Sequence, residues 1–340
     1  MHRKGPGEFS VPAPKVAIAC QGGGSHAAFV AGILCGLLAP ETRDSFQLVG
    51  LSGTSGGAVC AALAWSGLIG GGPAEAIHRL LGFWRDLETQ DWMDVAFNLW
   101  GQWLARMPVS AEVSPYLYEP MAEGRLRQLL RRHVKFEALP RSMSVRSAPK
   151  LLVGATEIRT GQRVIFEGET LTEDDLIASA AIPPLFRAVS AGDHLYWDGL
   201  FSTNPPVREF TDLHPDEIWV VQINPQKRAQ EPVAMSDIVD RRNELAGNLS
   251  LAQELYFVDK INQLLKDHPS LTDRYAPITV RVVELDFVDL DYPSKLDRST
   301  AFIQSLILDG RSKAGRFFEP GSIWSGRDNP PSRPIFPKRA

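Results

Sequence analysis

One serine lies between glycines in the stretch LVGLSGTSGGAVCAALA, residues 48–64. Ser55 follows an apolar run that predicts a buried strand, and small helix-forming residues come directly after it. Glycine tolerates the backbone angles of a tight strand-to-helix turn, which is the simplest reason for Gly53 and Gly57. The pattern G-x-S-x-G is also typical of a nucleophile elbow, in which a strained turn holds a reactive serine. Ser55 is therefore the first candidate for a catalytic nucleophile.

A second glycine-rich turn follows the strand expected over residues 15–20. Its glycines are Gly22, Gly23 and Gly24, here called the triglycine loop, and their spacing matches the loose dinucleotide fingerprint G-x-G-x-x-G/A. That fingerprint needs an acidic residue about 20 positions on, at the end of the next strand. The next strand ends in SGTS, without a carboxylate, and no Gly-Lys-Ser/Thr closes a phosphate-binding loop. The sequence therefore disfavours nucleotide binding.

Two strand–turn–helix units in succession predict a parallel sheet with helices packed on its faces. Neighbouring parallel strands place both glycine-rich turns at the carboxyl edge of the sheet, where open α/β sheets bind ligands. Ser55 would begin a helix, whose positive dipole end favours developing negative charge. The bare amides of the triglycine loop could hold an oxyanion, each such donor being worth roughly 3 to 4 kcal/mol in acyl transfer. These features indicate acyl-transfer chemistry.

A serine hydroxyl is a weak nucleophile and needs a base. An α/β-hydrolase would use a histidine, but His214 in DLHPDE and His268 in KDHPS lie in segments typical of surface turns. Asp198 follows the aromatic strand of HLYWDGLFSTNPP, where burial of the carboxylate would raise its basicity. Asp-Gly is also an ordinary turn pair. Asp198 is nevertheless the stronger candidate for the base.

Taken together, these blocks resemble the patatin-like phospholipases. The resemblance rests on QGGGSHAAF, GTSGG, ASAAIPPLF and YWDG followed by TNPP, and it covers roughly residues 15–225. It implies an α/β fold with three α/β/α layers, a mainly parallel central sheet and a Ser–Asp dyad without histidine. By the matching positions, Ser55 is the nucleophile, Asp198 is the base, and the triglycine loop is the oxyanion hole.

The chain departs from the family pattern at two places. His26 stands where the family usually has arginine or lysine, with Ala27 in place of a glycine, and Leu200 follows Asp-Gly where Gly or Ala is common. A protonated His26 could hold an anionic headgroup, given an unperturbed pKa of about 6.5. Alternatively, it is a helix-start residue that donates one hydrogen bond.

We expect one α/β hydrolase domain over residues 15–320, since neither a repeat nor a linker is evident. Residues 1–14 are expected to form a flexible leader, and the basic, proline-rich residues 321–340 a loose tail. A helical, tryptophan-rich insertion is expected at about residues 73–133. It contains four tryptophans within twenty residues: Trp84, Trp92, Trp100 and Trp103. Tryptophan favours the membrane–water boundary, so the Trp84–Trp103 region could contact a membrane peripherally, although core packing is the ordinary role of such residues.

Charge, cysteine content and hydrophobicity indicate further what kind of protein this is. The formal net charge of −4 gives no argument for nucleic acid as a partner, and the basic stretch RLRQLLRRHVKF is typical of a solvated helix face. Cys20, Cys35 and Cys60 form no C-x-x-C pair, which favours a reducing compartment. No apolar run approaches the roughly 18 residues of a spanning helix. We expect a cytoplasmic protein with at most peripheral membrane contact.

The sequence thus predicts a lipid acyl hydrolase of the phospholipase A or lysophospholipase type, acting on a phospholipid or other lipid ester without metal or cofactor. Two other classes stay open. One is a histidine-dependent carboxylesterase, and the other is a catalytically inactive module of the same fold that binds a lipid or a protein.

Overall fold

The computed structural model describes residues 13–89, 94–96, 98–99, 114–117, 121–139, 148–183, 185–228, 231–287 and 290–318. Almost all of the expected leader and the whole expected tail lie outside the described residues. So do Trp92, Trp100 and Trp103 of the expected insertion.

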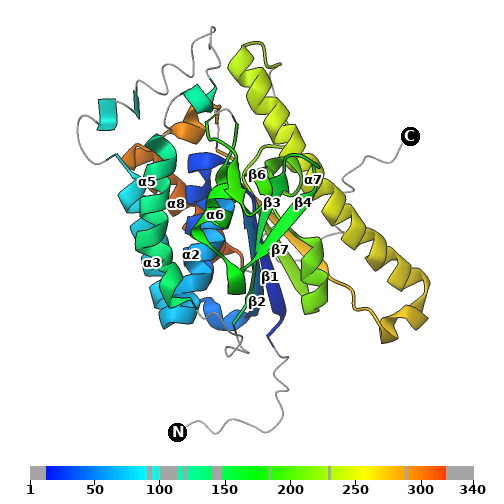
Figure 1. Ribbon diagram of the computed structural model, residues 1–340. Coiled ribbons are helices and arrows are strands. Elements are labelled where there is room, and N and C mark those ends of the chain that lie inside the picture. The colour runs from blue at the N-terminus through cyan, green and yellow to red at the C-terminus, as the bar shows by residue number, and fades with distance from the viewer. Residues whose placement is uncertain are drawn as a thin grey trace, which may run out of the picture.

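A central sheet forms the middle layer of the molecule (Figure 1). In the described residues its strand order is β5-β6-β3-β2-β1-β7-β8, with β4 also paired to β3. The strands are β1 (Lys15–Cys20), β2 (Gln47–Thr54), β3 (Lys150–Glu157), β4 (Arg163–Glu167), β5 (Val189–Ala191), β6 (His194–Asp198), β7 (Glu217–Gln222) and β8 (Thr279–Glu284). The run from β3 through β2, β1 and β7 to β8 is parallel, whereas β4 and β6 lie antiparallel to β3. The sheet is therefore mainly parallel, as the sequence predicts.

Helices cover both faces of this sheet. On one face lie α1 (Ala28–Leu37), α2 (Gly56–Gly71), α3 (Pro73–Leu87), α5 (Met121–Val134), α6 (Glu173–Ala180) and α8 (Thr300–Arg316). On the other lies α7 (Met235–Asp267), the long helix at the right of Figure 1. The three-layer α/β/α prediction is thus confirmed.

Strand β1 shows why both faces are apolar. Ile18 and Cys20 point into the core beneath α1 and α2, whereas Ala17 and Ala19 pack on the α7 side with Leu251. Alternate residues of a strand face opposite sides of its sheet, so a strand buried on both faces reads as a continuous apolar run. The run KVAIAC has this pattern, and for that reason its position was predictable.

Local signals also set the start of α6. Thr172 accepts a hydrogen bond from the backbone N–H of Asp175, and the Asp175 carboxylate accepts one from the backbone N–H of Thr172. This capping box satisfies two helix-end groups, with Thr172 as the N-cap. The carboxyl end of α6 then reaches the site described next.

Candidate active site

Ser55 joins β2 to α2 in a strained backbone conformation. Its φ is 55° and its ψ is −130°, a left-handed combination that is rare for any residue other than glycine. The neighbouring Gly57 packs directly on the end of β1, since a Cβ there would lie 2.2 Å from the carbonyl oxygen of Cys20. This is the strand–turn–helix geometry of a nucleophile elbow, with the serine at a helix N-terminus.

Ser179, near the carboxyl end of α6, holds the elbow in place. The Ser55 backbone N–H donates to the carbonyl oxygen of Ser179 at 3.1 Å and to its Oγ at 3.0 Å. The Ser179 hydroxyl in turn donates to the carbonyl oxygen of Gly154 in β3 at 2.6 Å. Ser179 is fully buried. Sequence reasoning missed this residue, although a buried serine in the apolar block ASAAIPPLF was the available signal.

Asp198 is the last residue of β6 and lies beside Ser55. Its carboxylate accepts a hydrogen bond from the Leu200 backbone N–H at 2.8 Å and lies close enough to the Ser55 side chain for that hydroxyl to lower its pKa. Burial raises the pKa of Asp198 to about 7, and these two donors oppose that rise. The structure therefore brings together the two residues that the sequence proposed as a dyad. A carboxyl group with a pKa near neutrality is suited to general-base chemistry.

Asp198 is also anchored through its backbone. Its N–H donates to the carbonyl oxygen of Ala181 at 3.0 Å, and its own carbonyl oxygen accepts a hydrogen bond from the Thr156 hydroxyl at 3.0 Å. These contacts tie the carboxylate to the segment after α6 and to β3. The same α6 region thus positions both Ser55 and Asp198.

The triglycine loop packs against Ser55. A Cβ at Gly22 would lie 2.6 Å from the Cβ of Ser55, so a side chain at this position would push the two turns apart. The N–H of Gly22 already donates to Asn204 Oδ1 at 2.8 Å. Within the described residues, the amides of Gly23 and Gly24 have no protein acceptor. They are the loop's available donors for an oxyanion.

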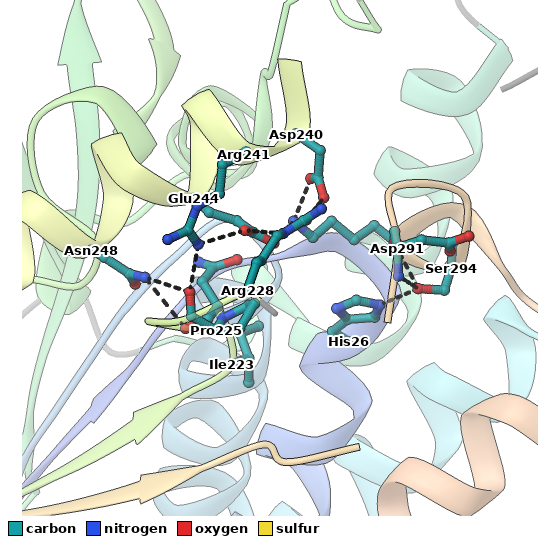
Figure 2. Close-up of polar contacts among 12 residues, drawn as sticks. His26, Ile223, Pro225, Arg228, Asp240, Arg241, Glu244, Asn248, Asp291 and Ser294 are labelled. Carbon is teal, nitrogen blue, oxygen red and sulfur yellow. Dashed lines mark hydrogen bonds and ion pairs between the residues drawn. The ribbon is translucent and has the colours of Figure 1, made fainter. Parts of the chain in front are cut away.

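Buried amide side chains hold the loop from behind. Gln21 Oε1 accepts the backbone N–H groups of Ile223 and Asn224 at 2.9 and 2.8 Å, and its Nε2 donates to Asn248 Oδ1 on α7 at 3.0 Å. Asn224 Nδ2 donates to the carbonyl oxygen of Gly22 at 3.0 Å. Figure 2 shows Asn248 reaching Pro225 as well. These supporting roles were not predictable from the sequence, because the hydrogen-bond partners of these residues are far away in the chain.

His26 is 1% exposed, and its Nε2 lies 2.8 Å from Ser294 Oγ (Figure 2). The Ser294 hydroxyl donates to the carbonyl oxygen of Asp291 at 2.7 Å, so the His26 Nε2–H is the donor to Ser294. Burial, together with the nearby charge of Lys295, holds the pKa of His26 well below its usual value. The ring is therefore neutral and holds no positive charge for an anionic headgroup. Its geometry matches the alternative of one donated hydrogen bond.

An ion-pair cluster ties the segment around Ser294 to α7 (Figure 2). Lys295 Nζ lies 2.6 Å from Asp240 and 3.3 Å from Glu244, and both carboxylates also pair with Arg228. Burial alone would raise the pKa of Glu244, but Arg228 and Lys295 lower it overall. The cluster therefore favours the charged form of Glu244 and fixes α7 beside the triglycine loop.

The histidines of the alternative esterase lie at the opposite edge of the sheet. Exposed His214 comes just before β7, whose first residue, Glu217, pairs with Val16 near the start of β1. Exposed His268 follows α7, and α7 reaches this same edge, where Asn262 bonds the backbone of Ile278. Ser55 follows the carboxyl end of β2. The structure does not bring either histidine to the serine.

Other predicted features lie outside the site. Trp84 is buried in the core, and Arg127 and Arg131 of the basic stretch pair with Glu173. Across the described residues, no group of three or more histidine, cysteine or acidic side chains is placed to hold a metal ion. Nor does any helix in the described segments have the length and apolar character needed to cross a membrane.

Comparison with known proteins agrees with the motif pattern. The family model described as patatin-like phospholipase matches residues 18–211, which include both turns and Asp198. The match confirms the resemblance drawn from the sequence. No curated protein matches the chain by sequence.

Solved structures give distant likenesses. VipD from Legionella pneumophila shares 12% identity at a TM-score of 0.39, with 88% of this chain and 68% of that chain covered. The type III effector ExoU shares 13% sequence identity at a TM-score of 0.35, with 90% of this chain and 52% of that chain covered. The structure of the ExoU–SpcU complex from the type III secretion system of Pseudomonas aeruginosa shares 17% sequence identity at a TM-score of 0.29. It covers 77% of this chain and 58% of that chain. This chain thus spans between about half and two thirds of those chains.

Proposed function

The chain belongs to the patatin-like phospholipase family, and on that premise we propose that it is a lipid acyl hydrolase with a Ser55–Asp198 dyad. The substrate class is a phospholipid or another lipid ester. The placement of the Ser55 side chain beside the buried Asp198 carboxylate is the observation that carries the proposal.

The reaction needs two half-steps. Ser55 Oγ attacks the acyl carbonyl carbon while its proton passes to Asp198, and the available amides of the triglycine loop, those of Gly23 and Gly24, stabilise the tetrahedral oxyanion. Collapse expels the alcohol part of the lipid, which takes the proton from Asp198 and leaves an acyl-enzyme. Water then attacks the acyl carbon and gives a proton to Asp198. The second collapse releases the fatty acid and returns the proton to Ser55.

The strained backbone at Ser55 supports this assignment independently of the family. A non-glycine residue in the left-handed region costs of order 1 to 3 kcal/mol, and such strain gathers at functional sites. Here Ser179, buried behind the elbow, offsets that cost through two hydrogen bonds to the Ser55 N–H. The fold therefore keeps a destabilising backbone conformation that presents the Ser55 hydroxyl at a helix N-terminus.

A fluorophosphonate probe and a soluble short-chain ester test the dyad. Ser55→Ala should abolish labelling, and Asp198→Asn should slow both labelling and hydrolysis about 10³-fold or more, as for other residues that act as one catalytic unit. Asp175→Asn is the matched control, because Asp175 is a buried carboxylate in the α6 capping box. Full labelling of the Ser55→Ala variant would refute the proposal.

The same experiment separates the remaining alternative of an inactive binding module. Such a module would hydrolyse neither the soluble ester nor vesicle lipid, whatever residue stands at position 55. Mass spectrometry of the products from mixed phospholipids and neutral esters, with Ser55→Ala as the blank, would then identify the bond that is cleaved.

A further inference from the structure

Helix α7 carries much of the exposed apolar surface among the described residues. Its inward face packs on the sheet through Leu251, Leu255 and Val258. Its large exposed apolar residues are Met235, Ile238, Leu245, Leu249, Tyr256, Phe257 and Leu264. Leu245 and Leu249 are 53% and 55% exposed. Apolar side chains gathered in this way on one helix mark an interaction surface more often than singly scattered ones do.

A stripe runs along the outward side of this helix. Ile238, Leu245, Leu249 and Tyr256 are spaced by seven, four and seven residues, which places them on one side of an α-helix. They lie roughly opposite Leu251 and the other inward residues. Figure 1 shows α7 running along the outer side of the molecule, away from the other α-helices.

Most exposed charges of α7 are basic, whereas most of its acidic residues face inward. The exposed charged side chains of the helix are the basic Arg242, Lys260 and Lys266 and the acidic Asp267, its last residue. The other acidic residues are buried or partly buried: Asp237, Asp240, Glu244, Asp259 and Glu254. Asp240 and Glu244 form ion pairs within the cluster described above. In a chain whose net charge is −4, the exposed side of α7 is therefore apolar with an excess of basic residues.

We propose that the outward face of α7 docks on a bilayer surface that contains anionic lipid. An interfacial helix buries an apolar stripe at the headgroup boundary while its basic residues contact anionic headgroups. A second copy of this chain is a poorer occupant, because two identical basic faces would repel each other. The inference rests on the proposed lipid substrate, but it concerns a surface outside the dyad.

Docking through α7 would hold the molecule on the lipid surface by a helix that also contacts the catalytic apparatus. The inner side of α7 contacts the residues around the dyad: Asn248 bonds Gln21, and Ser250 Oγ accepts the N–H of Asn204 at 3.1 Å. A Cβ on Gly247 would lie 2.8 Å from a methyl carbon of Leu200, two residues after Asp198. The same helix therefore supports the site on one side and offers the apolar, basic face on the other.

Vesicle co-sedimentation tests the surface, with Ser55→Ala as the background so that no lipid is consumed. The chain should bind vesicles of phosphatidylcholine with phosphatidylglycerol, and bind those of phosphatidylcholine alone more weakly. Replacing Arg242 and Lys260 together by Gln should weaken binding to the anionic vesicles about thirty-fold, since each basic residue near such a surface is worth about 1 kcal/mol. Added salt should weaken wild-type binding as well.

Replacing Leu245 and Leu249 together by Ser should weaken binding to both kinds of vesicle by about tenfold or more. Leu308→Ser is the matched apolar control, because Leu308 is 65% exposed on α8, across the sheet. Vesicle binding that is unchanged in both α7 variants would overturn the proposal. So would equal loss in the Leu308→Ser control, or α7 variants that change only self-association in size-exclusion chromatography.

Hydrolysis of the soluble short-chain ester separates this inference from the proposed function. With Ser55 restored, the α7 variants should keep wild-type activity on the soluble ester and lose it on anionic vesicles. Loss on both substrates would mean that α7 acts through the fold, which overturns the docking role. A wild-type chain that binds vesicles but cleaves no ester would instead overturn the proposed function and leave the docking surface standing.

Discussion

Asp198 shows how a single residue can be made reactive at the expense of stability. The residue is 1% exposed, and burial raises its pKa to about 7, whereas an unfolded aspartate titrates near 3.9. The folded state therefore binds the proton more tightly than the unfolded state does. The resulting stability is complete below about pH 4 and is lost as the pH rises through about 7.

This linkage makes a prediction for Asp198→Asn. Because asparagine carries no charge, the variant should gain thermal stability relative to the wild type as the pH rises from 5 to 8. The gain in the free energy of unfolding should be about 1.4 kcal/mol for each unit by which folding raises the pKa, which amounts to a few kcal/mol at most. Melting temperatures of both proteins across this range measure it. A difference that is constant with pH would show that the carboxylate is not held at a raised pKa.

At the scale of elements, the site is where two strand–turn–helix units meet. Gly22 in the first turn approaches Ser55 in the second closely enough that no side chain would fit. Asn204 accepts the N–H of Gly22, and so fixes how the loop is presented to the serine. We expect the loop to lose this orientation when the Asn204 amide is removed.

Asn204→Ala should therefore lower kcat for the soluble ester about 10- to 100-fold, with little change in KM, since leaving a buried donor unpaired costs about 1 to 3 kcal/mol. Asn262→Ala is the matched control, because Asn262 makes equivalent bonds to the backbone of Ile278 at the far edge of the sheet. Both variants should lose similar stability. If kcat falls equally in the Asn262→Ala control, Asn204 acts only through the stability of the fold and not by orienting the loop.

The sequence predicted the elements whose signals are local. The apolar run of β1 and the glycines around Ser55 each act within a few residues, and the strand and the strand-to-helix turn that they predict are present. Ser179, Gln21 and Asn204 were missed because their partners lie far along the chain. Short β5 was missed as well, since three residues give no measurable alternation. Long-range hydrogen bonds leave no periodic trace in a sequence.

At the scale of the whole molecule, the sheet separates two edges with different roles. Both glycine-rich turns lie at the carboxyl edge, whereas His214 and the end of α7 lie at the amino edge. The six residues of β1 span about 20 Å at 3.3 Å per residue, which is far beyond the reach of direct proton transfer. A histidine at that edge cannot serve Ser55.

The double variant His214→Ala with His268→Ala should therefore keep wild-type kcat/KM on the soluble ester, within about twofold, and keep full labelling by the fluorophosphonate probe. Both side chains are exposed, so stability should change little as well. A histidine-dependent esterase would lose activity about 10³-fold or more when its base is removed. Such a loss in this variant, together with an active Asp198→Asn variant, would contradict the Ser–Asp dyad and support a histidine base. It would also contradict the placement of the two histidines at the edge of the sheet opposite Ser55.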